Sequence, residues 1–279
     1  MQPFPETTWR LLQSPPAEGA WNMAVDEAIL DGVRQDESPA TLRLYAWEPS
    51  CFSLGYAQSA ADVDQAFLER AGWHLVRRPT GGRAILHTDE LTYSVIGPPE
   101  DPRLAGSVLE SYRCLSQALL HALHLLGIPA EAHEKSSETA GAGPAANPIC
   151  FEVPSNYEIT VGGKKLVGSA QARRRNGVLQ HGSLPLIGDL TRIVQALSLP
   201  DEASRQEAAD RLLEHATTVE AVLGKVISWE QAARAYVQAF REVLNLELVP
   251  GALSQAEIQR AESLRQEKYA HPHWNLRRS

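Results

Sequence analysis

The stretch ICFEVPSNYEITVGGKKLVGSAQARRRNGVLQHGSL, residues 149–184, carries the densest chemistry of the chain and indicates a β-hairpin at its centre. Tyr157–Val161 alternates as a strand, and Gly162-Gly163 is a two-residue turn signal. Lys165–Ala170 is typical of the returning strand. The turn therefore places Lys165 near the beginning of that second strand.

A cysteine precedes this hairpin, in a segment bracketed by Pro148 and Pro154. Proline restricts the backbone and makes regular secondary structure hard to continue, so we expect Cys150 in a stiff, exposed loop. A reactive thiol needs access and a nearby positive charge, which Lys165 could supply. Cys150 is thus a candidate nucleophile. The simpler interpretations are a small apolar residue beside Phe151 and a solvated lysine.

Small residues continue through the hairpin where an ordinary strand prefers bulky ones. Gly168-Ser169-Ala170-Gln171 indicates that something packs against this face or enters between strands, and His181-Gly182 is expected to interrupt the next strand in the same manner. His181 is a candidate for proton transfer. However, a histidine in a strand is more often a satisfied structural group, and no carboxylate close in sequence indicates a triad.

A second informative segment, RRPTGGRAILHTDELTYSVIG, spans residues 77–97. Its Thr80-Gly81-Gly82 predicts a tight loop between strands, because paired glycines permit positive φ and close approach of a backbone to a ligand. The positive and imidazole side chains around the loop are Arg77, Arg78, Arg83 and His87. A hairpin turn with solvated arginines is an equally good interpretation of this segment alone. The spacing excludes a P-loop.

Composition excludes several classes of function. The 279 residues are 43% hydrophobic with a formal charge of −8, and Arg173-Arg174-Arg175 is the only basic cluster. Binding to nucleic acid held mainly by phosphate contacts needs clustered positive charge, so we do not expect it. No apolar run approaches the roughly 20 residues needed to span a bilayer. The N-terminus MQPFPETTWR lacks the regions of a signal peptide, so we expect a cytoplasmic protein.

The cysteine count argues against a disulfide framework and against a zinc site. There are three cysteines, an odd number, and they lack the spacing of metal ligands. Cys51 lies in an apolar run and Cys114 inside a helical pattern, so both are expected to be packing residues. We predict reduced thiols and no metal.

The remaining chain predicts an alternation of strands and helices. The predicted strands are Thr8–Leu12, Thr41–Trp47, Cys51–Gly55 and Trp73–Arg77. The predicted helices are Ala20–Arg34, Asp62–Ala71, Ser107–Leu126, Asp189–Leu197, Glu202–His215, Trp229–Leu244 and Ser254–Tyr269. Residues 134–148 lack periodicity and predict a long loop of the kind that often binds ligands.

Three local features accompany these elements. In the first helix, Asn22 and Asp26 are candidates for polar contacts to the site, although solvent-facing or capping roles are the simpler interpretation. Ser228 and Gln231 have the spacing of a capping box. The tail HPHWNLRRS is expected to dock on the protein rather than to take part in catalysis.

The motifs together resemble one family. RRPTGGRAILH at residues 77–87, GGKKLVGSAQ at 162–171 and QHGSL at 180–184 occur in the order and separation of the lipoate-protein ligase and octanoyltransferase family, which is related in fold to biotin-protein ligases. The resemblance covers about residues 20–245. It implies an α+β fold with a mixed, mostly antiparallel β-sheet flanked by helices. It also implies a single catalytic domain over residues 1–279, whose helical C-terminal part, residues 189–279, packs on the sheet.

The resemblance also assigns roles to residues. In that family the lysine aligned with Lys165 contacts the acyl carbonyl region, and the loop aligned with Arg78–His87 lines the acyl pocket. Cys150 and Lys165 are therefore the implied catalytic residues. The implied substrate-binding residues are Arg78, Thr80, Gly81, Gly82, His87, Gly168, Ser169, Ala170 and His181.

The position of the cysteine selects among members of the family. ATP-dependent ligases form an acyl-adenylate and need no cysteine, whereas octanoyltransferases carry the acyl group on their own cysteine. A cysteine upstream of the lysine, as in PICFEVPSNYEI, resembles the LipM-type octanoyltransferases. LipB-type enzymes carry theirs downstream, where this chain has Leu179-Gln180-His181 and no cysteine. The related octanoyl amidotransferase also uses a cysteine, so the donor stays open.

The implied reaction moves octanoyl from octanoyl-acyl carrier protein to Cys150, and then to the lysine of a lipoyl domain such as the glycine cleavage H protein. A thioester is more reactive than an amide, so neither ATP nor another cofactor is expected. The alternatives are an ATP-dependent lipoate ligase, in which Cys150 is incidental, and a non-catalytic module that binds lipoyl domains or carrier proteins. The group that deprotonates the acceptor amine is not predicted.

Overall fold

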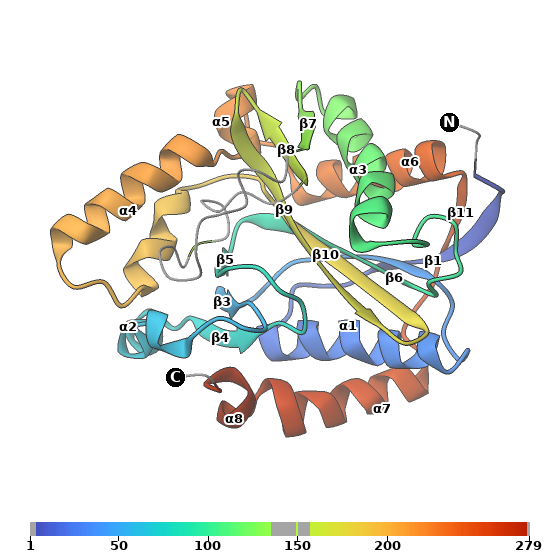
Figure 1. The fold of residues 1–279 in the computed structure, drawn as a ribbon, viewed down its shortest axis with the longest axis horizontal. Coiled ribbons are helices and arrows are strands. Elements are labelled where there is room, and N and C mark those ends of the chain that lie inside the picture. Colours follow the sequence, from blue (N-terminus) through green and yellow to red (C-terminus); the bar gives the residue numbers. More distant parts are fainter. Residues whose placement is uncertain (1–3, 135–148, 150–156, 278–279) are drawn as a thin grey trace.

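The structure, a computed structural model, describes residues 4–134, 149 and 157–277 of the chain. Its large sheet has eight strands in the order β11-β1-β2-β6-β10-β9-β8-β7, and a smaller sheet has the order β4-β3-β5 (Figure 1). In the large sheet β1 runs parallel to β11 and β2, while the other neighbours are antiparallel. The mixed, mostly antiparallel sheet predicted from the sequence is confirmed.

The strands of the large sheet are β1 (Thr7–Gln13), β2 (Thr41–Tyr45), β6 (Glu90–Gly97), β7 (Glu131–Glu134), β8 (Tyr157–Val161), β9 (Lys164–Arg174), β10 (Gly177–Pro185) and β11 (Leu246–Pro250). Those of the smaller sheet are β3 (Cys51–Leu54), β4 (His74–Arg77) and β5 (Ile85–His87). The helices are α1 (Gly19–Arg34), α2 (Gln65–Ala71), α3 (Val108–Leu125), α4 (Glu202–His215), α5 (Val219–Leu223), α6 (Trp229–Leu244), α7 (Gln255–Leu264) and α8 (Pro272–Asn275). Shorter helical turns cover Ala60–Asp62, Leu190–Ala196 and Arg265–Tyr269.

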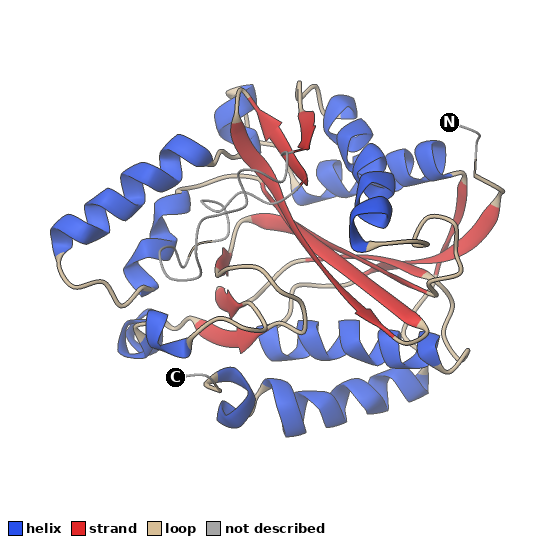
Figure 2. Cartoon of the chain, viewed as in Figure 1, coloured by secondary structure: helices blue, strands red, loops and turns tan. Residues whose placement is uncertain are grey.

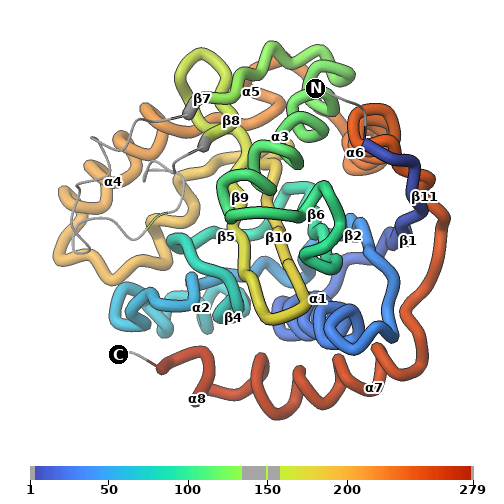
Figure 3. Tube along the Cα trace, turned by 45° about the vertical axis from the view of Figure 1, so that its right-hand side comes forward, coloured from blue at the N-terminus to red at the C-terminus, as the bar shows by residue number. Residues whose placement is uncertain are grey.

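Helices cover both faces of the large sheet (Figure 2). One face packs against α3 and α6, and the other against α1. The alternation of side chains along a strand divides β2 between these cores, because Leu42 and Leu44 face α3 and α6 while Tyr45 faces α1. Figure 3 shows α7 running along the outer side of α1. No helix among the described residues is both long and apolar enough to cross a membrane.

The central hairpin forms as predicted. Gly162 and Gly163 join β8 to β9 with φ values of 55° and 79°, the left-handed conformation that a two-residue hairpin turn requires. Lys165 is the second residue of β9. The predicted interruption at His181-Gly182 is wrong, because β10 pairs continuously with β6 and β9 through this point. Gly182 is instead a close-packing position, where a Cβ would lie 2.6 Å from Tyr93 Cε1.

Of the other local predictions, some are confirmed by the structure and one is wrong in part. The Ser228–Gln231 capping box is present at the start of α6. The C-terminal tail is docked, since Arg77 donates through Nη2 to the carbonyls of Asn275 and Arg277, both at 2.9 Å. The segment predicted as a helix over residues 189–197 is a 3₁₀ helix over Leu190–Ala196. The division of the chain into a catalytic core and a helical C-terminal part stays a prediction.

The loop that follows β4 packs against a glycine in the turn after β3. A Cβ on Gly55 would lie 1.9 Å from the backbone oxygen of Gly82, whereas a Cβ on Gly81 would meet no heavy atom within 4 Å. We expect Gly55→Ala to lower the free energy of unfolding by about 1–3 kcal/mol through overpacking. Gly81→Ala is the matched control and should change it by less than about 1 kcal/mol. Denaturant unfolding of the two variants checks this, and equal effects would contradict it.

Candidate functional site

A small cavity of about 20 Å³ lies where the smaller sheet faces the large sheet. Its walls come from β2, β6, β9 and β10 on one side and from β5 and the loop after β4 on the other. The residues that line it are Tyr45, Trp47, Arg78, Ile85, His87, Thr92, Gly168, Ser169, Ala170, His181, Gly182 and Ser183. The structure therefore brings together six of the predicted substrate-binding residues, from motifs far apart in sequence. Their role in binding stays a prediction.

Arg78 shapes the loop that forms one wall of this cavity. Its side chain is 2% exposed and donates through Nη1 to the Ser53 carbonyl and through Nη2 to the carbonyls of Gly81 and Arg83, at 2.9, 3.2 and 2.9 Å. Thr80 is buried within the same loop, and Gly82 has a φ of 89°. The interpretation as a turn with solvated arginines is wrong for Arg78, because its guanidinium holds backbone carbonyls inside the protein.

The loop is linked to the large sheet through His181. The Thr80 hydroxyl lies 2.7 Å from His181 Nε2, and His181 Nδ1 lies 3.4 Å from Asp26 Oδ2. Asp26 comes from α1 and His181 from β10, which are 155 residues apart in sequence. A carboxylate therefore does face the histidine, and a search for partners close in sequence could not have found it.

Asp26 is the centre of a buried polar network. It accepts hydrogen bonds from Arg43 Nη1 at 2.8 Å, Ser94 Oγ at 2.9 Å and the Tyr45 hydroxyl at 3.0 Å. The solvent-facing or capping role expected for Asp26 and Asn22 is wrong. Both are fully buried, and Asn22 Oδ1 accepts from Arg43 Nη2 at 2.7 Å.

Burial and the neighbouring charges together determine the protonation states of Asp26 and His181. Burial alone would raise the pKa of Asp26, but Arg43 and His181 together outweigh burial and hold that pKa below its usual value. Burial lowers the pKa of His181, and Asp26 opposes that shift only in part. The network at neutral pH therefore contains a carboxylate, a guanidinium and a neutral imidazole.

A second imidazole on the cavity wall has a similar arrangement. His87 Nδ1 lies 2.7 Å from Glu90 Oε1, and His87 Nε2 lies 2.7 Å from Ser53 Oγ. The Trp47 ring stacks on His87 with 3.9 Å between centroids. Burial would raise the pKa of Glu90, but His87 and the hydroxyls of Thr92 and Ser183, which donate to its carboxylate, bring it below the usual value.

Lys165 is buried rather than solvated, so the simpler interpretation of this lysine is wrong. It is 5% exposed, and its Nζ lies 3.4 Å from Glu158 Oε1 on the neighbouring strand β8. Across the hairpin the Thr160 hydroxyl is buried without a hydrogen-bond partner among the described residues. Glu158 was not predicted, because its approach to Lys165 depends on the register of the hairpin. Lys165 does not line the small cavity.

Cys150 lies outside the described residues, so its predicted contact with Lys165 stays a prediction. Its chain neighbour Ile149 is described, is buried, and forms a parallel β-bridge with Ala84, next to the cavity-lining Ile85.

The other two cysteines are packing residues, as predicted. Burial raises the pKa of Cys51 far above its usual value and that of Cys114 to about 11. Both thiols are therefore protonated at neutral pH and lack the thiolate character that a nucleophile needs.

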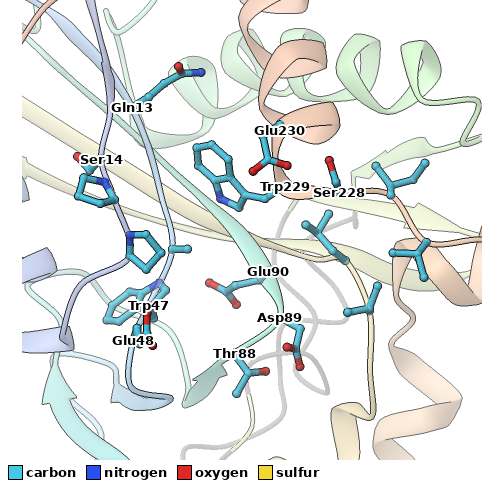
Figure 4. Close-up of a pocket in the computed structure, with 17 residues that line it drawn as sticks. Gln13, Ser14, Trp47, Glu48, Thr88, Asp89, Glu90, Ser228, Trp229 and Glu230 are labelled. Carbon is cyan, nitrogen blue, oxygen red and sulfur yellow. The ribbon is translucent and has the colours of Figure 1, made fainter.

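A larger cavity of about 610 Å³ is lined in part by Trp47 (Figure 4). Figure 4 shows side chains reaching it from the end of β1, from the turn between β5 and β6, and from the start of α6. Its labelled lining residues are Gln13, Ser14, Trp47, Glu48, Thr88, Asp89, Glu90, Ser228, Trp229 and Glu230. Trp47 lines both cavities. The described ranges contain no group of three or more His, Cys, Asp or Glu side chains that could hold a metal ion.

The neutral state of buried His181 has a consequence for stability. Because the folded-state pKa lies below the ordinary 6.5, acid protonates this residue in the unfolded chain first, and stability falls as pH drops below about 6.5. We expect the His181→Gln variant to lose less unfolding free energy than the native protein between pH 7 and pH 5. Denaturant unfolding at several pH values measures the slope. His215→Gln, at an exposed position, is the control; an unchanged slope in His181→Gln would contradict the assignment.

Solved structures share this fold. A bipartite lipoate protein ligase from Thermoplasma acidophilum, described together with its E2 lipoyl domain, matches with a TM-score of 0.80 and 24% identity, covering 98% of each chain. A lipoate-protein ligase A bound with ATP matches with a TM-score of 0.78 and 24% identity, covering 98% of this chain and all of the other.

Curated relatives match over nearly their whole length. Octanoyltransferase LipM of Kyrpidia tusciae is 42% identical over 275 residues, which cover 97% of this chain and 99% of that protein. Octanoyltransferase LipM of Moorella thermoacetica is 42% identical over 276 residues, which cover 99% and 100%. The lipoyl protein ligase A/B catalytic domain matches residues 18–241. The chain therefore belongs to the family defined by that catalytic domain.

Proposed function

We propose that this protein is an octanoyltransferase that carries the acyl group as a thioester on Cys150. The observation that supports this most strongly is the similarity, along nearly the whole chain, to relatives named as octanoyltransferases. The position of the cysteine agrees with it, because Cys150 precedes Lys165 and no cysteine stands at Leu179-Gln180-His181.

The first half-reaction is acylation of the enzyme. The Cys150 thiolate attacks the carbonyl carbon of octanoyl-acyl carrier protein, and the bond between that carbon and the carrier sulfur breaks. The carrier leaves as a thiolate and takes up the proton that Cys150 released on ionising. The buried ammonium of Lys165 stabilises the negative charge that develops on the carbonyl oxygen. The bridge between Ile149 and Ala84 supports the choice of Cys150 as the nucleophile. It fixes the residue bonded to Cys150 next to Ile85 of β5, which lines the small cavity.

The second half-reaction is transfer to an amine. The lysine of a lipoyl domain attacks the enzyme thioester and forms an amide, with the Cys150 thiol as the leaving group. The family itself is named for lipoyl proteins, which favours such a domain as the acceptor. The glycine cleavage H protein is our first candidate.

The acyl chain is proposed to occupy the cavity between the two sheets. Gly168 and Ala170 leave space beside β9, and Ile85 supplies an apolar wall. A cavity of about 20 Å³ holds about one water molecule, so an eight-carbon chain can enter only if the walls move apart. The loop held by Arg78 is one of these walls, and the Thr80 hydroxyl joins it to His181 of the large sheet.

An ATP-dependent lipoate ligase is the alternative function, because the fold also matches a ligase bound with ATP. In that case Arg78 and Lys165 would hold an acyl-adenylate, and Cys150 would not react. A module that only binds lipoyl domains or carrier proteins would show binding without turnover.

Mass spectrometry after incubation with octanoyl-acyl carrier protein separates these functions. We expect the native protein to gain the mass of one octanoyl group without ATP, and the Cys150→Ala variant to gain none. Cys114→Ala is the matched control and should acylate as the native protein does. Formation of an octanoyl-adenylate that survives in Cys150→Ala would establish the ligase instead. An octanoyl ester lost in Thr80→Val but retained in Cys150→Ala would move the nucleophile to Thr80.

Two adjacent lysines test the role of the buried ammonium. Lys165 is buried beside Glu158, whereas Lys164 is exposed and donates to the Leu213 carbonyl. We expect Lys165→Gln to slow acylation of Cys150 by about 10²–10³-fold, since it removes a cation that stabilises the developing oxyanion. Lys164→Gln should stay within about threefold of the native rate. Quench-flow measurement of acyl-enzyme formation gives both rates, and equal rates for the two variants would refute the role of Lys165.

A further inference from the structure

We propose that Thr80, His181 and Asp26 form a proton relay that accepts the proton of the attacking amine, with Asp26 as the positioning residue of His181. This inference rests on the proposed function and concerns its second half-reaction. It answers a question that the sequence left open, namely which group deprotonates the acceptor lysine.

The three groups form a continuous chain of contacts and come from three separate elements. Thr80 lies in the loop after β4, His181 in β10 and Asp26 in α1. The hydroxyl lies 2.7 Å from His181 Nε2, and His181 Nδ1 lies 3.4 Å from Asp26 Oδ2. All three side chains are buried, with 1%, 5% and 0% exposed, so bulk water does not compete for these hydrogen bonds.

Asp26 determines which ring nitrogen of His181 carries the proton. An ionised carboxylate only accepts hydrogen bonds, so His181 Nδ1 must donate to it. Because the neutral imidazole then has an unprotonated Nε2, that nitrogen accepts the hydroxyl proton of Thr80. The Thr80 oxygen keeps lone pairs that can accept a proton from an amine once the walls of the cavity have moved apart. A proton can therefore pass from the amine to Thr80 while the hydroxyl proton of Thr80 passes to His181.

The charges around His181 keep its imidazole neutral before the amine attacks. On the side of α1 and β2, Asp26 is paired with Arg43 and bound by Tyr45. On the side of the smaller sheet, Arg78 and His87 disfavour a second positive charge. Among the residues that the structure describes, Asp26 is the group that stabilises the imidazolium when a proton arrives. The ring can thus take up a proton transiently and give it back.

The other histidine of the cavity is a poorer base for this purpose. Ser53 donates to His87 Nε2 or accepts from it, but the Ser53 hydroxyl is fully buried and already accepts from Arg78 Nη1 at 2.5 Å. The attacking amine gains positive charge as its bond to the acyl carbon forms. The positive guanidinium of Arg78, bound to the Ser53 oxygen, repels that charge. The geometry therefore favours His181 over His87.

The transfer step balances without any further reactant. The bond between the lysine nitrogen and the acyl carbon forms, and the bond between that carbon and the Cys150 sulfur breaks. One amine proton reaches Thr80, whose own proton moves to His181. The imidazolium proton then returns through Thr80 to the departing thiolate, which leaves the relay and the thiol as they began.

The test separates the two half-reactions. The enzyme is first loaded by octanoyl-acyl carrier protein, and the loaded enzyme is then mixed with an excess of a lipoyl domain in single-turnover experiments followed by mass spectrometry. We expect Thr80→Val to slow amide formation by about 10²-fold, the usual size of general-base catalysis, and to slow acylation by a factor about tenfold smaller. Thr80→Ser keeps the hydroxyl and should restore transfer to within about tenfold.

The pH dependence of transfer tests Asp26 itself. We expect Asp26→Asn to shift the acid limb of the pH–rate profile for amide formation to lower pH and to lower its plateau, because the imidazolium loses its stabilising partner. Ser94→Ala is the matched control, since Ser94 donates to the same carboxylate at 2.9 Å and, although it pairs with His181 across β6 and β10, takes no part in the relay. Its acid limb should stay in place. If Asp26→Asn does not fold, because Arg43 is left unpaired, the two Thr80 variants decide the question.

Three results overturn the relay. The first is native transfer in Thr80→Val with an unchanged pH profile. The second is an equal loss in both half-reactions, which would indicate a structural role for the hydroxyl. The third is a failure of the native protein to form an acyl-enzyme, which overturns the proposed function as well and is recognised before any variant is compared.

Discussion

The buried ion pair between Asp26 and Arg43 is the interaction on which the site depends. Both side chains are almost fully excluded from solvent, at 0% and 1% exposed, and their charged atoms lie 2.8 Å apart. Removing one partner of such a pair costs about 3–5 kcal/mol, because it leaves an uncompensated charge inside the protein. Through this pair α1 is attached to the large sheet, and the same carboxylate orients His181 on the wall of the cavity. The Asp26 carboxylate therefore has two roles, because it both attaches α1 to the sheet and orients His181.

The two sheets have different parts in building the site. The large sheet supplies the small residues of β9 and the imidazole of β10, while the smaller sheet supplies Arg78 and His87. Arg77 attaches the C-terminal tail to the smaller sheet. Its guanidinium donates to the carbonyl of Gly55 in the turn after β3 and to the carbonyl of Asn275 in the tail. Arg77 and Asn275, which are far apart in sequence, thus meet at one turn. This arrangement explains why the motifs that form the cavity lie so far apart in sequence.

Much of the fold could be predicted because its signals are local. Paired glycines specified the hairpin, and apolar stripes specified the longer helices. The motifs also led to the correct family, which the relatives and the catalytic-domain match confirm. What could not be predicted depends on long-range pairing. Asp26 looked like a surface residue of a helix, and nothing near His181 in sequence indicated a carboxylate. Lys165 looked solvated because its burial and its partner Glu158 follow from the register of β8 against β9.

Octanoyl transfer by way of Cys150 is the central claim of this account, and it places the acyl chain between the two sheets. The most direct measurement is a crystal structure of the octanoylated protein. We predict continuous electron density from the Cys150 sulfur into the cavity lined by Ile85, Gly168 and Ala170, with the thioester oxygen within reach of Lys165 Nζ. An acyl chain bound elsewhere, or a Cys150 sulfur that lies far from Lys165 in the loaded enzyme, would contradict octanoyl transfer by way of Cys150.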